Sequence, residues 1–434
     1  MLDIQFIREN PELVAEKSRQ KGYDVDVNRL LVLDSERRTR LTQIDELRRR
    51  RNELSDALKH HRPSEQQIIA GRRLKDELSL REGELARIET ELTDQMKRVP
   101  NMPLDDVPVG SSEDENVVIK EVGDKKEFDF APKTHWEIAG PRDLIDKERA
   151  AKVAGSRFAY IKGPLVELQF AIIRFVLHVL SDEMTLHRII EEQGLAIAAK
   201  PFTPVLPPAL IKTQVYDAMD RLEPRDDRYR AGEDDDDLWL QGSAEHTLGS
   251  MYMDEILPES MLPVRYIGYL TSFRREAGTY GKDTEGIIRM HQFDKLEMEV
   301  FSTAESGLDE HRLLVALQEY LVQQLGLPYR VVQKCTADIG KPNARGIDIE
   351  TWMPGQGKYR ETHSADYMTD YQARRLKTRV KRQNGAVELV HTNDATAFAL
   401  GRIMAAVMEN NQTHDGHIMV PEVLQPYLDG KTQL

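Results

Sequence analysis

One short segment, FRREAGTYGKDTEGIIRMHQFDKLE at residues 273–297, concentrates side chains that could bind a nucleotide. Arg274 can hold a phosphate with its forked guanidinium, Glu276 can accept a hydrogen bond from an exocyclic amine, and Phe293 offers a flat face for base stacking. A cation, an acceptor and an aromatic ring so close together predict an ATP site. The alternative is a charged surface hairpin whose side chains only pair with one another.

Three glycines, Gly278, Gly281 and Gly286, stand in the same segment. A dinucleotide-binding loop would need a helix directly after the glycines and an acidic residue for the ribose, and neither pattern follows them. The flanks are instead suited to strands, so the segment predicts a β-hairpin whose tip carries Lys282 and Asp283. The ligand would then lie on the surface of a sheet.

The elements that must position these side chains follow residue 130. Short runs suited to strands, such as LPVRYIGYLTSF and VELVHT, occur among amphipathic helical stretches, such as DEHRLLVALQEYLVQQLG and FALGRIMAAVMENN. The two kinds of segment do not alternate regularly. This favours an α+β fold with an antiparallel sheet flanked by helices over a doubly wound parallel sheet.

Residues 29–98 have a different pattern, in which apolar residues recur at alternating steps of three and four. In the second half these residues are Leu74, Leu78, Leu85, Ile88 and Leu92. Pro63 cannot continue a helix and Ser64 can cap the next one. The pattern predicts an antiparallel two-helix coiled-coil arm, about 50 Å long at 1.5 Å per residue.

The arm also differs from the rest of the chain in charge. Residues 29–98 hold 17 Lys and Arg against 14 Asp and Glu, whereas the whole chain has a formal net charge of -14. The overall charge argues against indiscriminate nucleic-acid binding, but a basic arm could follow nucleic-acid phosphates. The basic residues in question are Arg48, Arg49, Arg50, Arg51, Lys59, Arg62, Arg72 and Arg73. The alternative is a coiled coil whose charges only keep it soluble.

Cysteine content and hydropathy indicate the cellular compartment in which the protein works. The single cysteine, Cys335, leaves no intrachain disulfide and fits a reducing environment. The first residues, MLDIQFIREN, lack the apolar core of a signal peptide, and the apolar stretch LVELQFAIIRFVLHVL is interrupted by Glu167 and Arg174. We therefore expect a cytoplasmic protein that does not enter a membrane.

Several segments together resemble one family. The segment 273–297 resembles motif 2 of class II aminoacyl-tRNA synthetases, in the form typical of bacterial-type seryl-tRNA synthetases. FTPVLPPALI resembles motif 1, and AFALGRIMAAVMEN with VPEVLQPYL resembles motif 3 and the C-terminal signature. ERAAKVAGSRFAYIKG is similar to the segment before motif 1, and the predicted arm is similar to the tRNA-binding arm. The resemblance covers nearly the whole chain.

The resemblance assigns roles to matching positions. It implies that Arg274 contacts the α-phosphate and the substrate carboxylate, and that Arg402 contacts the γ-phosphate, which makes these two the catalytic residues. Glu276 would read the adenine and Phe293 would stack on it. The full set expected to bind ATP is Arg274, Arg275, Glu276, Arg289, Phe293, Glu361, Thr362, His363, Ser364 and Arg402. Within RETHS, Glu361 and Ser364 would hold Mg²⁺ against the phosphates.

A serine pocket is implied as well, from Ser243, Ala244, Glu245, Arg274, Glu297 and Thr396. Physical reasoning agrees, because selecting serine over alanine requires a polar partner for one hydroxyl, and Glu297 with Thr396 can supply it. Some positions depart from the family. HTNDATAFALGR stands where HTLNGSGLAVGR is usual, so Asp394 replaces an asparagine and adds a carboxylate close to the expected pocket.

The resemblance implies a two-step ligase. It would activate L-serine with ATP to seryl-adenylate, then charge tRNA(Ser), with tRNA(Sec) as a further substrate expected from the family. Residues 1–105 would form the tRNA-binding domain and residues 106–434 the catalytic domain of a homodimer. Two alternatives stay open, namely a ligase that loads an amino acid onto a carrier protein, and a tRNA-binding paralogue without catalysis.

Overall fold

The computed structural model describes residues 1–59, 63–232, 237–277 and 285–434. Its contacts divide the chain into two compact units, Met1–Met102 and Pro103–Leu434. The sequence predicts this division between residues 105 and 106. Arg62 of the arm, Gly278, Gly281 and the hairpin tip with Lys282 and Asp283 lie outside the described residues.

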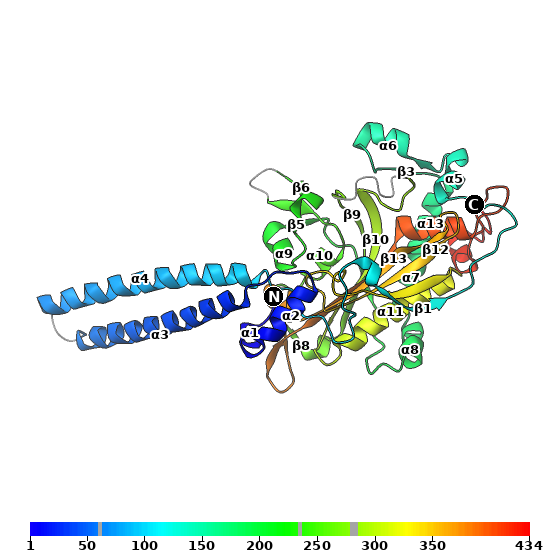
Figure 1. Cartoon of the computed structure of the whole chain (residues 1–434). Helices are drawn as coiled ribbons and strands as arrows, with labels where there is room; N and C mark the ends of the chain where they lie inside the picture. The colour runs from blue at the N-terminus through cyan, green and yellow to red at the C-terminus, as the bar shows by residue number, and fades with distance from the viewer. Residues whose placement is uncertain (60–62, 233–236, 278–284) are drawn as a thin grey trace. The chain divides into compact units, whose positions relative to one another are not determined.

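The first unit is helical and consists of α1 (Ile4–Glu9), α2 (Pro11–Gln20), α3 (Val27–Ala57) and α4 (Glu65–Met96). The helix α3 starts where the Asp26 carboxylate accepts a hydrogen bond from Arg29 N at 2.9 Å. The helix α4 starts where Ser64 and Gln67 form a capping box. Figure 1 shows α3 and α4 as the two limbs of a hairpin, which confirms the predicted arm.

Apolar side chains hold α3 and α4 together. Ile44 and Leu47 of α3 pack with Leu78 of α4, and Leu74 and Leu85 complete this cluster. Ion pairs between the two helices flank the apolar residues, namely Arg29–Glu91 at 2.6 Å, Arg37–Glu89 at 3.2 Å, Arg40–Glu84 at 3.1 Å and Arg48–Glu82 at 2.8 Å. Because the pairs are at least partly exposed to solvent, they contribute little stability, and the apolar side chains fix the register.

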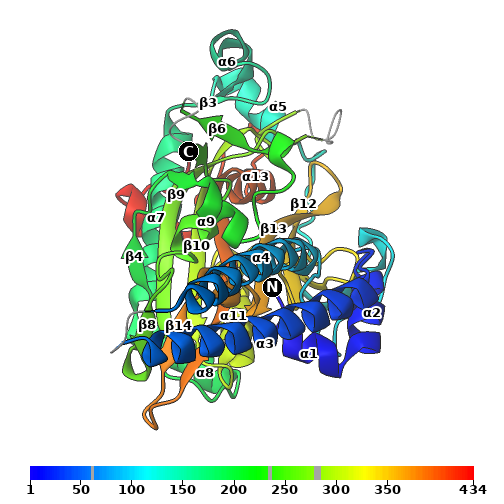
Figure 2. The ribbon, with the colours of Figure 1, turned by 90° about the vertical axis from the view of Figure 1, so that its left-hand side faces the viewer.

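The second unit contains an eight-stranded sheet with the order β1-β11-β12-β13-β16-β10-β9-β4. In that order the strands are Val117–Val122, Tyr329–Gln333, Arg345–Met353, Lys358–Thr369, His391–Ala399, Gln292–Ser302, Val264–Phe273 and Thr203–Val205. All neighbours are antiparallel except β4 and β9. Figure 2 shows β9 and β10 side by side, as their hydrogen bonds require. The predicted antiparallel α+β fold is confirmed.

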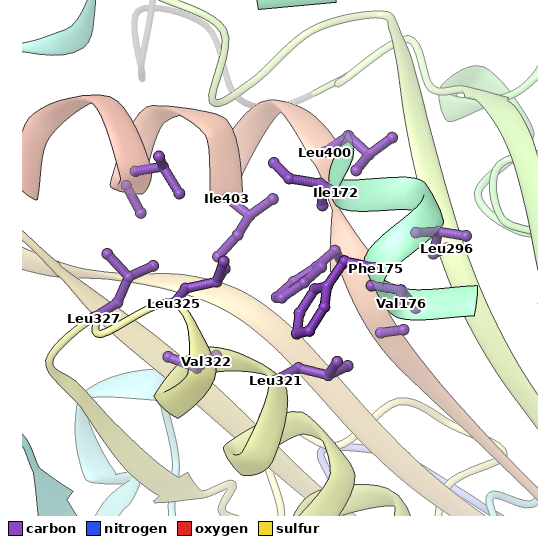
Figure 3. Packing of buried hydrophobic residues seen from close by; sticks show 14 of the residues in the cluster. Ile172, Phe175, Val176, Leu296, Leu321, Val322, Leu325, Leu327, Leu400 and Ile403 are labelled. Carbon is purple, nitrogen blue, oxygen red and sulfur yellow. The ribbon is translucent and has the colours of Figure 1, made fainter. Parts of the chain in front are cut away.

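One hydrophobic core joins the sheet to the helices α7 (Pro164–Ser181), α11 (Gly307–Gln324) and α13 (Leu400–Asn410). Figure 3 shows Phe175 of α7, Leu321 of α11 and Ile403 of α13 converging in this core. Among the described residues, α7 alone is long and apolar enough to cross a membrane, but it buries eight side chains in the protein. Burial of this kind is typical of a core helix.

Smaller elements surround the sheet. The remaining α-helices are α5 (His135–Ala139), α6 (Lys147–Ala154), α8 (Glu183–Glu192), α9 (Thr213–Ala218), α10 (Glu245–Leu248) and α12 (Tyr371–Leu376). Two three-stranded sheets have the orders β15-β14-β8 and β5-β7-β6, and β2 pairs with β3. Their strands are Val387–Leu389, Arg379–Lys381 and Ile256–Pro258, then Leu210–Lys212, Leu238–Leu240 and Tyr229–Ala231, then Ile145–Asp146 and Tyr160–Ile161.

Candidate active site

The two faces of the central sheet differ in polarity. On β16, Ala395 and Ala397 belong to the hydrophobic core. Because successive side chains of a strand point to opposite faces, Asp394 and Thr396 lie on the other face. Polar groups therefore gather on the side of the sheet away from the core.

Strand register arranges these polar groups in rows. Thr396 lies opposite Glu297 of β10. Asp394 lies between Glu299 of β10 and Asp366 of β13. Residues directly opposite one another have Cβ atoms about 5 Å apart. Asp366, Asp394 and Glu299 therefore form a continuous line of acids, which we name the carboxylate row.

A cavity of about 360 Å³ lies on this face, and residues predicted from four separate segments line it. They are Ser243 and Glu245, then Arg274, Glu276, Arg289 and Phe293, then Glu361, Thr362 and Ser364, and finally Thr396 and Arg402. Arg274 and Arg402 come from distant parts of the sequence. The fold brings both guanidinium groups to the wall of one cavity, as a single bound nucleotide would require.

Some predicted residues do not line the cavity within the described ranges, namely Arg275, Ala244, Glu297 and His363. Strand alternation turns the His363 ring toward the core, where its centroid lies 5.1 Å from that of Phe398. Arg275 is exposed, and its guanidinium lies 4.9 Å from the ring centroid of Tyr229. Ala244 and Glu297 are completely buried.

Backbone and side-chain contacts hold Arg274 in place. Its Nε donates to Gly242 O at 3.0 Å, and its guanidinium lies 5.4 Å from the ring centroid of Phe293. Gly242 N donates to His246 Nδ1 at 3.2 Å. Burial and the nearby Arg228 lower the pKa of His246 well below its ordinary value, so the ring is neutral and can accept this bond. His246 thus helps to fix the carbonyl that orients Arg274.

Arg402 is held beside Glu361 on β13. Its Nη1 donates to Glu361 O at 3.0 Å and lies 3.0 Å from the Glu361 carboxylate. Although desolvation favours the neutral acid, the charges of Arg402 and Lys334 lower the pKa of Glu361 to about 2. Glu276 and Arg289 are also ion-paired. We name the part of the cavity lined by Arg274, Glu276, Arg289, Phe293, Glu361 and Arg402 the phosphate end. Two of its arginines, Arg289 and Arg402, are already paired with acids.

The opposite part of the cavity, which we name the amino-acid end, begins at Ser243. Lys295 Nζ lies 2.5 Å from Glu297 Oε2 and donates to Ser243 Oγ at 3.4 Å. Burial raises the pKa of Glu297, and the ammonium of Lys295 opposes this shift. Lys295 thus stands between the completely buried Glu297 and the cavity.

Glu245 is paired with a different cation, Arg221. Arg221 Nε donates to Glu245 Oε1 at 2.7 Å, and Gln372 Nε2 donates to the same oxygen at 3.2 Å. Arg221 Nη2 donates to Asn343 Oδ1 at 3.2 Å and lies 3.7 Å from Asp394 Oδ1, which is too far for a hydrogen bond. Arg221 therefore attracts Asp394 electrostatically but does not donate a hydrogen bond to it.

The carboxylate row has few partners. In the described part of the chain, Asp394 Oδ1, Asp366 Oδ1 and both carboxylate oxygens of Glu299 are buried and accept no hydrogen bond. Burial, reinforced by neighbouring acids, raises the pKa values of Asp394 and Glu299 well above the ordinary values. Neutral, protonated acids can lie beside one another where charged ones would repel. The raised pKa values favour the protonated forms of Asp394 and Glu299, and a bound cation would favour their ionised forms.

Comparison with known proteins agrees with this geometry. A model described as "Seryl-tRNA synthetase N-terminal domain" matches residues 1–103, and one described as "tRNA synthetase class II core domain (G, H, P, S and T)" matches residues 229–411. The serine–tRNA ligase of Symbiobacterium thermophilum is 40% identical over 437 residues, which cover 98% of both chains. That of Exiguobacterium sp. is 37% identical over 441 residues, covering 100% of this chain and 99% of the relative.

A solved structure agrees over the whole length. The seryl-tRNA synthetase from Pyrococcus horikoshii, crystallised in complex with ATP, is 36% identical with a TM-score of 0.88, and the match covers 100% of this chain and 99% of that one. The chain belongs to the seryl-tRNA synthetase family. Its relatives are named as ligases, so this member of the seryl-tRNA synthetases is an enzyme of that class.

The arm presents on its surface the predicted basic residues that the structure describes. Arg48 lies 2.8 Å from Glu82, Arg49 and Arg50 lie 2.6 Å and 3.0 Å from Glu46, and Lys59 lies 2.6 Å from Asp56. These four basic side chains are still 50–66% exposed. Arg51, Arg72 and Arg73 are exposed as well. Because exposed pairs are weak, phosphates could replace their acidic partners.

Sequence reasoning missed several cavity residues, namely Arg221, Arg228, His246, Lys295, Lys334 and Asp366. A simple signal existed for two of them. Lys295 precedes Glu297 by two positions on a predicted strand, and Asp366 follows Ser364 by two, so each pair shares a face. Arg221 gave no such signal, because it follows the short helix α9 and only the tertiary fold brings it to Glu245.

Proposed function

We propose that this enzyme activates L-serine with ATP and transfers the seryl group to the 3′-terminal ribose of tRNA(Ser). The observation that carries the proposal is that Arg274 and Arg402 line the same cavity as Phe293, Glu245 and Thr396. Family membership supports the same reaction. The shared cavity can accommodate a nucleotide at its phosphate end and a small amino acid at the other.

In the first step, a serine carboxylate oxygen attacks the α-phosphorus of ATP. The bond from the α-phosphorus to the bridging oxygen breaks, and its electron pair leaves with pyrophosphate. Arg274 would spread the charge that develops at the α-phosphate, while Arg402 would bind the leaving group; both residues line the cavity. Phe293 would stack against adenine, with Glu276 as the hydrogen-bond acceptor for its amine.

In the second step, a hydroxyl of the terminal ribose attacks the carbonyl carbon of seryl-adenylate, and AMP leaves with the electrons of the broken bond. The mixed anhydride is already a reactive acyl donor. Positioning of the ribose therefore suffices, and no protein nucleophile is required.

The amino-acid end supplies the chemistry for selecting serine. Thr396 lines the cavity and lies opposite Glu297 in the register, so the hydroxyl of serine would meet polar partners. Alanine would leave those partners unmatched, which disfavours it by orders of magnitude. The acids at this end, including Glu245 and Asp394, would attract the ammonium group of the substrate.

The donor set on β13 fits Mg²⁺. Glu361 and Ser364 both line the cavity, and a carboxylate with a hydroxyl matches the oxygen ligands that Mg²⁺ takes beside nucleotide phosphates. The low pKa of Glu361 keeps its carboxylate ionised and able to coordinate a cation. Bound there, Mg²⁺ would neutralise phosphate charge.

The remaining partners follow from the family. We propose that residues 1–105 bind tRNA through the exposed basic residues of the arm, by shape more than by bases, and that residues 106–434 carry catalysis. Charging of tRNA(Sec), a homodimeric assembly and a cytoplasmic location are further parts of the proposal. A structural relative supports the location, namely the cytoplasmic serine–tRNA ligase of Naegleria fowleri in complex with AMP, which is 28% identical with a TM-score of 0.85.

Pyrophosphate exchange with a panel of amino acids tests the proposed reaction. We expect ATP to incorporate labelled pyrophosphate with serine and not with alanine, threonine or cysteine. Charging of tRNA(Ser) should follow in the same preparation. Exchange with a different amino acid would contradict the proposed substrate, and no exchange with any of them would favour a tRNA-binding protein without catalysis.

A further inference from the structure

A buried histidine outside the cavity contacts residues 285–293, the second half of the 273–297 segment, which we name the return limb. His135 begins α5 and is completely buried. Its Nδ1 lies 2.8 Å from Glu409 Oε1, and its Nε2 accepts a hydrogen bond from Ile287 N at 3.1 Å. Ile287 lines the cavity, whereas the two buried side chains that support it do not.

The hydrogen bonds assign the proton on the histidine ring. The Glu409 carboxylate accepts from His135 N at 3.2 Å, Gln356 Nε2 at 2.9 Å and Gly355 N at 3.0 Å, in addition to the ring. A carboxylate that receives four donors is the ionised acceptor, so the imidazole carries its proton on Nδ1. The unprotonated Nε2 is then the acceptor that the Ile287 amide needs.

Glu409 connects this histidine to two further parts of the site. It lies on α13, the helix that carries Arg402. Its contacts with Gly355 and Gln356 fix the turn between β12 and β13, and β13 carries Glu361. One buried carboxylate therefore joins the helix of one arginine, the strand of Glu361 and, through His135, the limb that ends at Phe293.

Close backbone approaches show how tightly these segments fit. A Cβ added to Gly286 would lie 2.0 Å from His135 Nε2, and one added to Gly355 would lie 2.3 Å from Lys133 O. A Cβ added to Gly401 would lie 2.7 Å from Ile287 O. Separations under 3.0 Å are not tolerated by real side chains, so each position accepts only glycine without movement. The return limb is thus packed against α13 on one side and His135 on the other.

We propose that His135 and Glu409 are positioning residues for ATP binding. They set the place of Ile287 and Ile288, whose backbone also meets Arg402, since Arg402 Nε lies 3.4 Å from Ile288 O. A shift of this limb would move Arg289 and Phe293 relative to Arg402. The inference rests on the proposed function, because it assigns the adenine and phosphates of ATP to that part of the cavity.

Two substitutions separate the two hydrogen bonds of the ring. His135→Asn places an amide nitrogen near the position of Nδ1, which keeps the donor to Glu409 and removes the acceptor for Ile287 N. His135→Gln places an amide oxygen near the position of Nε2, which keeps that acceptor. We measure KM for ATP and for serine by pyrophosphate exchange. His187→Asn, an exposed histidine on α8, is the control.

We expect His135→Asn to raise KM for ATP about tenfold, the effect of one buried amide without its partner, and to leave KM for serine within about twofold. His135→Gln should restore KM for ATP to near the wild-type value. A wild-type enzyme without serine-dependent exchange would contradict the proposed function instead. Given an active wild type, equal behaviour of the two variants, or a parallel rise of both KM values, overturns the inference.

If either variant fails to fold, amide hydrogen exchange of the wild-type protein replaces the kinetic comparison. The Ile287 amide should then be protected as strongly as amides in the centre of β10, because it is bonded to a buried ring. Exchange as fast as that of exposed loop amides would overturn the proposal.

Discussion

The two ends of the cavity differ in how completely their acidic side chains are paired with cations. At the phosphate end, Arg402 is paired with Glu361 at 3.0 Å, and Arg289 is paired with Glu276. At the amino-acid end, Glu245 is paired with Arg221 at 2.7 Å, but Asp394 Oδ1 and the Glu299 carboxylate, which does not line the cavity, are buried without hydrogen bonds in the described part of the chain. The phosphate end pairs its acids with cations, whereas the amino-acid end also contains unpaired acids whose burial favours the protonated form.

Under the proposed function, the difference follows from the charges that each end would receive. Phosphates bring several negative charges, so cations have to be present and oriented before ATP binds, and acidic partners hold them there. Serine would bring its ammonium and its hydroxyl to the amino-acid end, while its carboxylate faces the α-phosphate. The raised pKa values favour the neutral form of the buried acids, and a bound ammonium would shift them toward the ionised form. We therefore expect substitutions at the phosphate end to affect catalysis most, and those at the amino-acid end to affect selectivity.

The largest effect is expected for Arg274→Ala. Serine-dependent pyrophosphate exchange should fall about 1,000-fold in kcat/KM, because a cation at the reacting phosphate is lost. The thermal midpoint should change little, since Arg274 is only partly buried. Arg312→Ala, which changes an exposed arginine on α11, is the matched control and should retain wild-type exchange. Comparable losses in both variants would show that the arginine at the cavity has no special role.

Glu297→Gln should weaken selectivity at the amino-acid end. We expect the ratio of kcat/KM for serine over alanine to fall about 100-fold, because loss of the Glu297 charge weakens the contact that holds Lys295 at the cavity wall beside Ser243. The KM for ATP should stay within about twofold. An unchanged ratio, or a rise in KM for ATP, would contradict the division between the two ends.

Asp394→Asn should raise KM for serine about tenfold, because one charge-assisted contact with the ammonium is lost. The KM for ATP should not change. Asp143→Asn is the control, since Asp143 is exposed and has a left-handed backbone that asparagine also adopts. A variant with wild-type KM for serine would exclude Asp394 from ammonium binding.

The smallest expected effect is a change in how the free energy of unfolding depends on pH. Because burial raises the pKa values of Asp394 and Glu299, the folded protein binds more protons than the unfolded chain above the ordinary carboxyl pKa of about 4. The free energy of unfolding should therefore fall as the pH rises through the folded-state pKa values. Asp394→Asn should flatten this dependence and raise the thermal midpoint at pH 8 by about 2 °C. Scanning calorimetry from pH 5 to pH 8 measures both, and a steeper dependence in the variant would contradict the sign.

Local patterns in the sequence indicated one part of the phosphate end, whereas Arg402 and Glu361 were assigned only through the family resemblance. Arg274, Glu276 and Phe293 stand in one segment, so their types and spacing alone indicate a nucleotide site. The arm was equally predictable, because its apolar period of three and four is a local property. Both results depend on residues that are close together in the chain.

The remaining features depend on contacts that only the fold creates. The carboxylate row needs the register of β13, β16 and β10, and a slip of one residue would turn Asp366 to the core. Arg221 reaches Glu245 from a different segment, and His135 meets Ile287 across 152 positions of sequence. No periodicity or spacing within one segment contains this information.

Proton release on ligand binding tests most directly whether a bound ammonium displaces protons from Asp394 and Glu299. Calorimetric titration in buffers of different ionisation enthalpy compares a seryl-sulfamoyl-adenosine analogue with the same compound lacking its α-amine. We predict that the aminated ligand releases more protons near neutral pH, because its ammonium lowers the pKa values of the buried acids. Equal release by both ligands, or net proton uptake with the aminated one, would contradict the account.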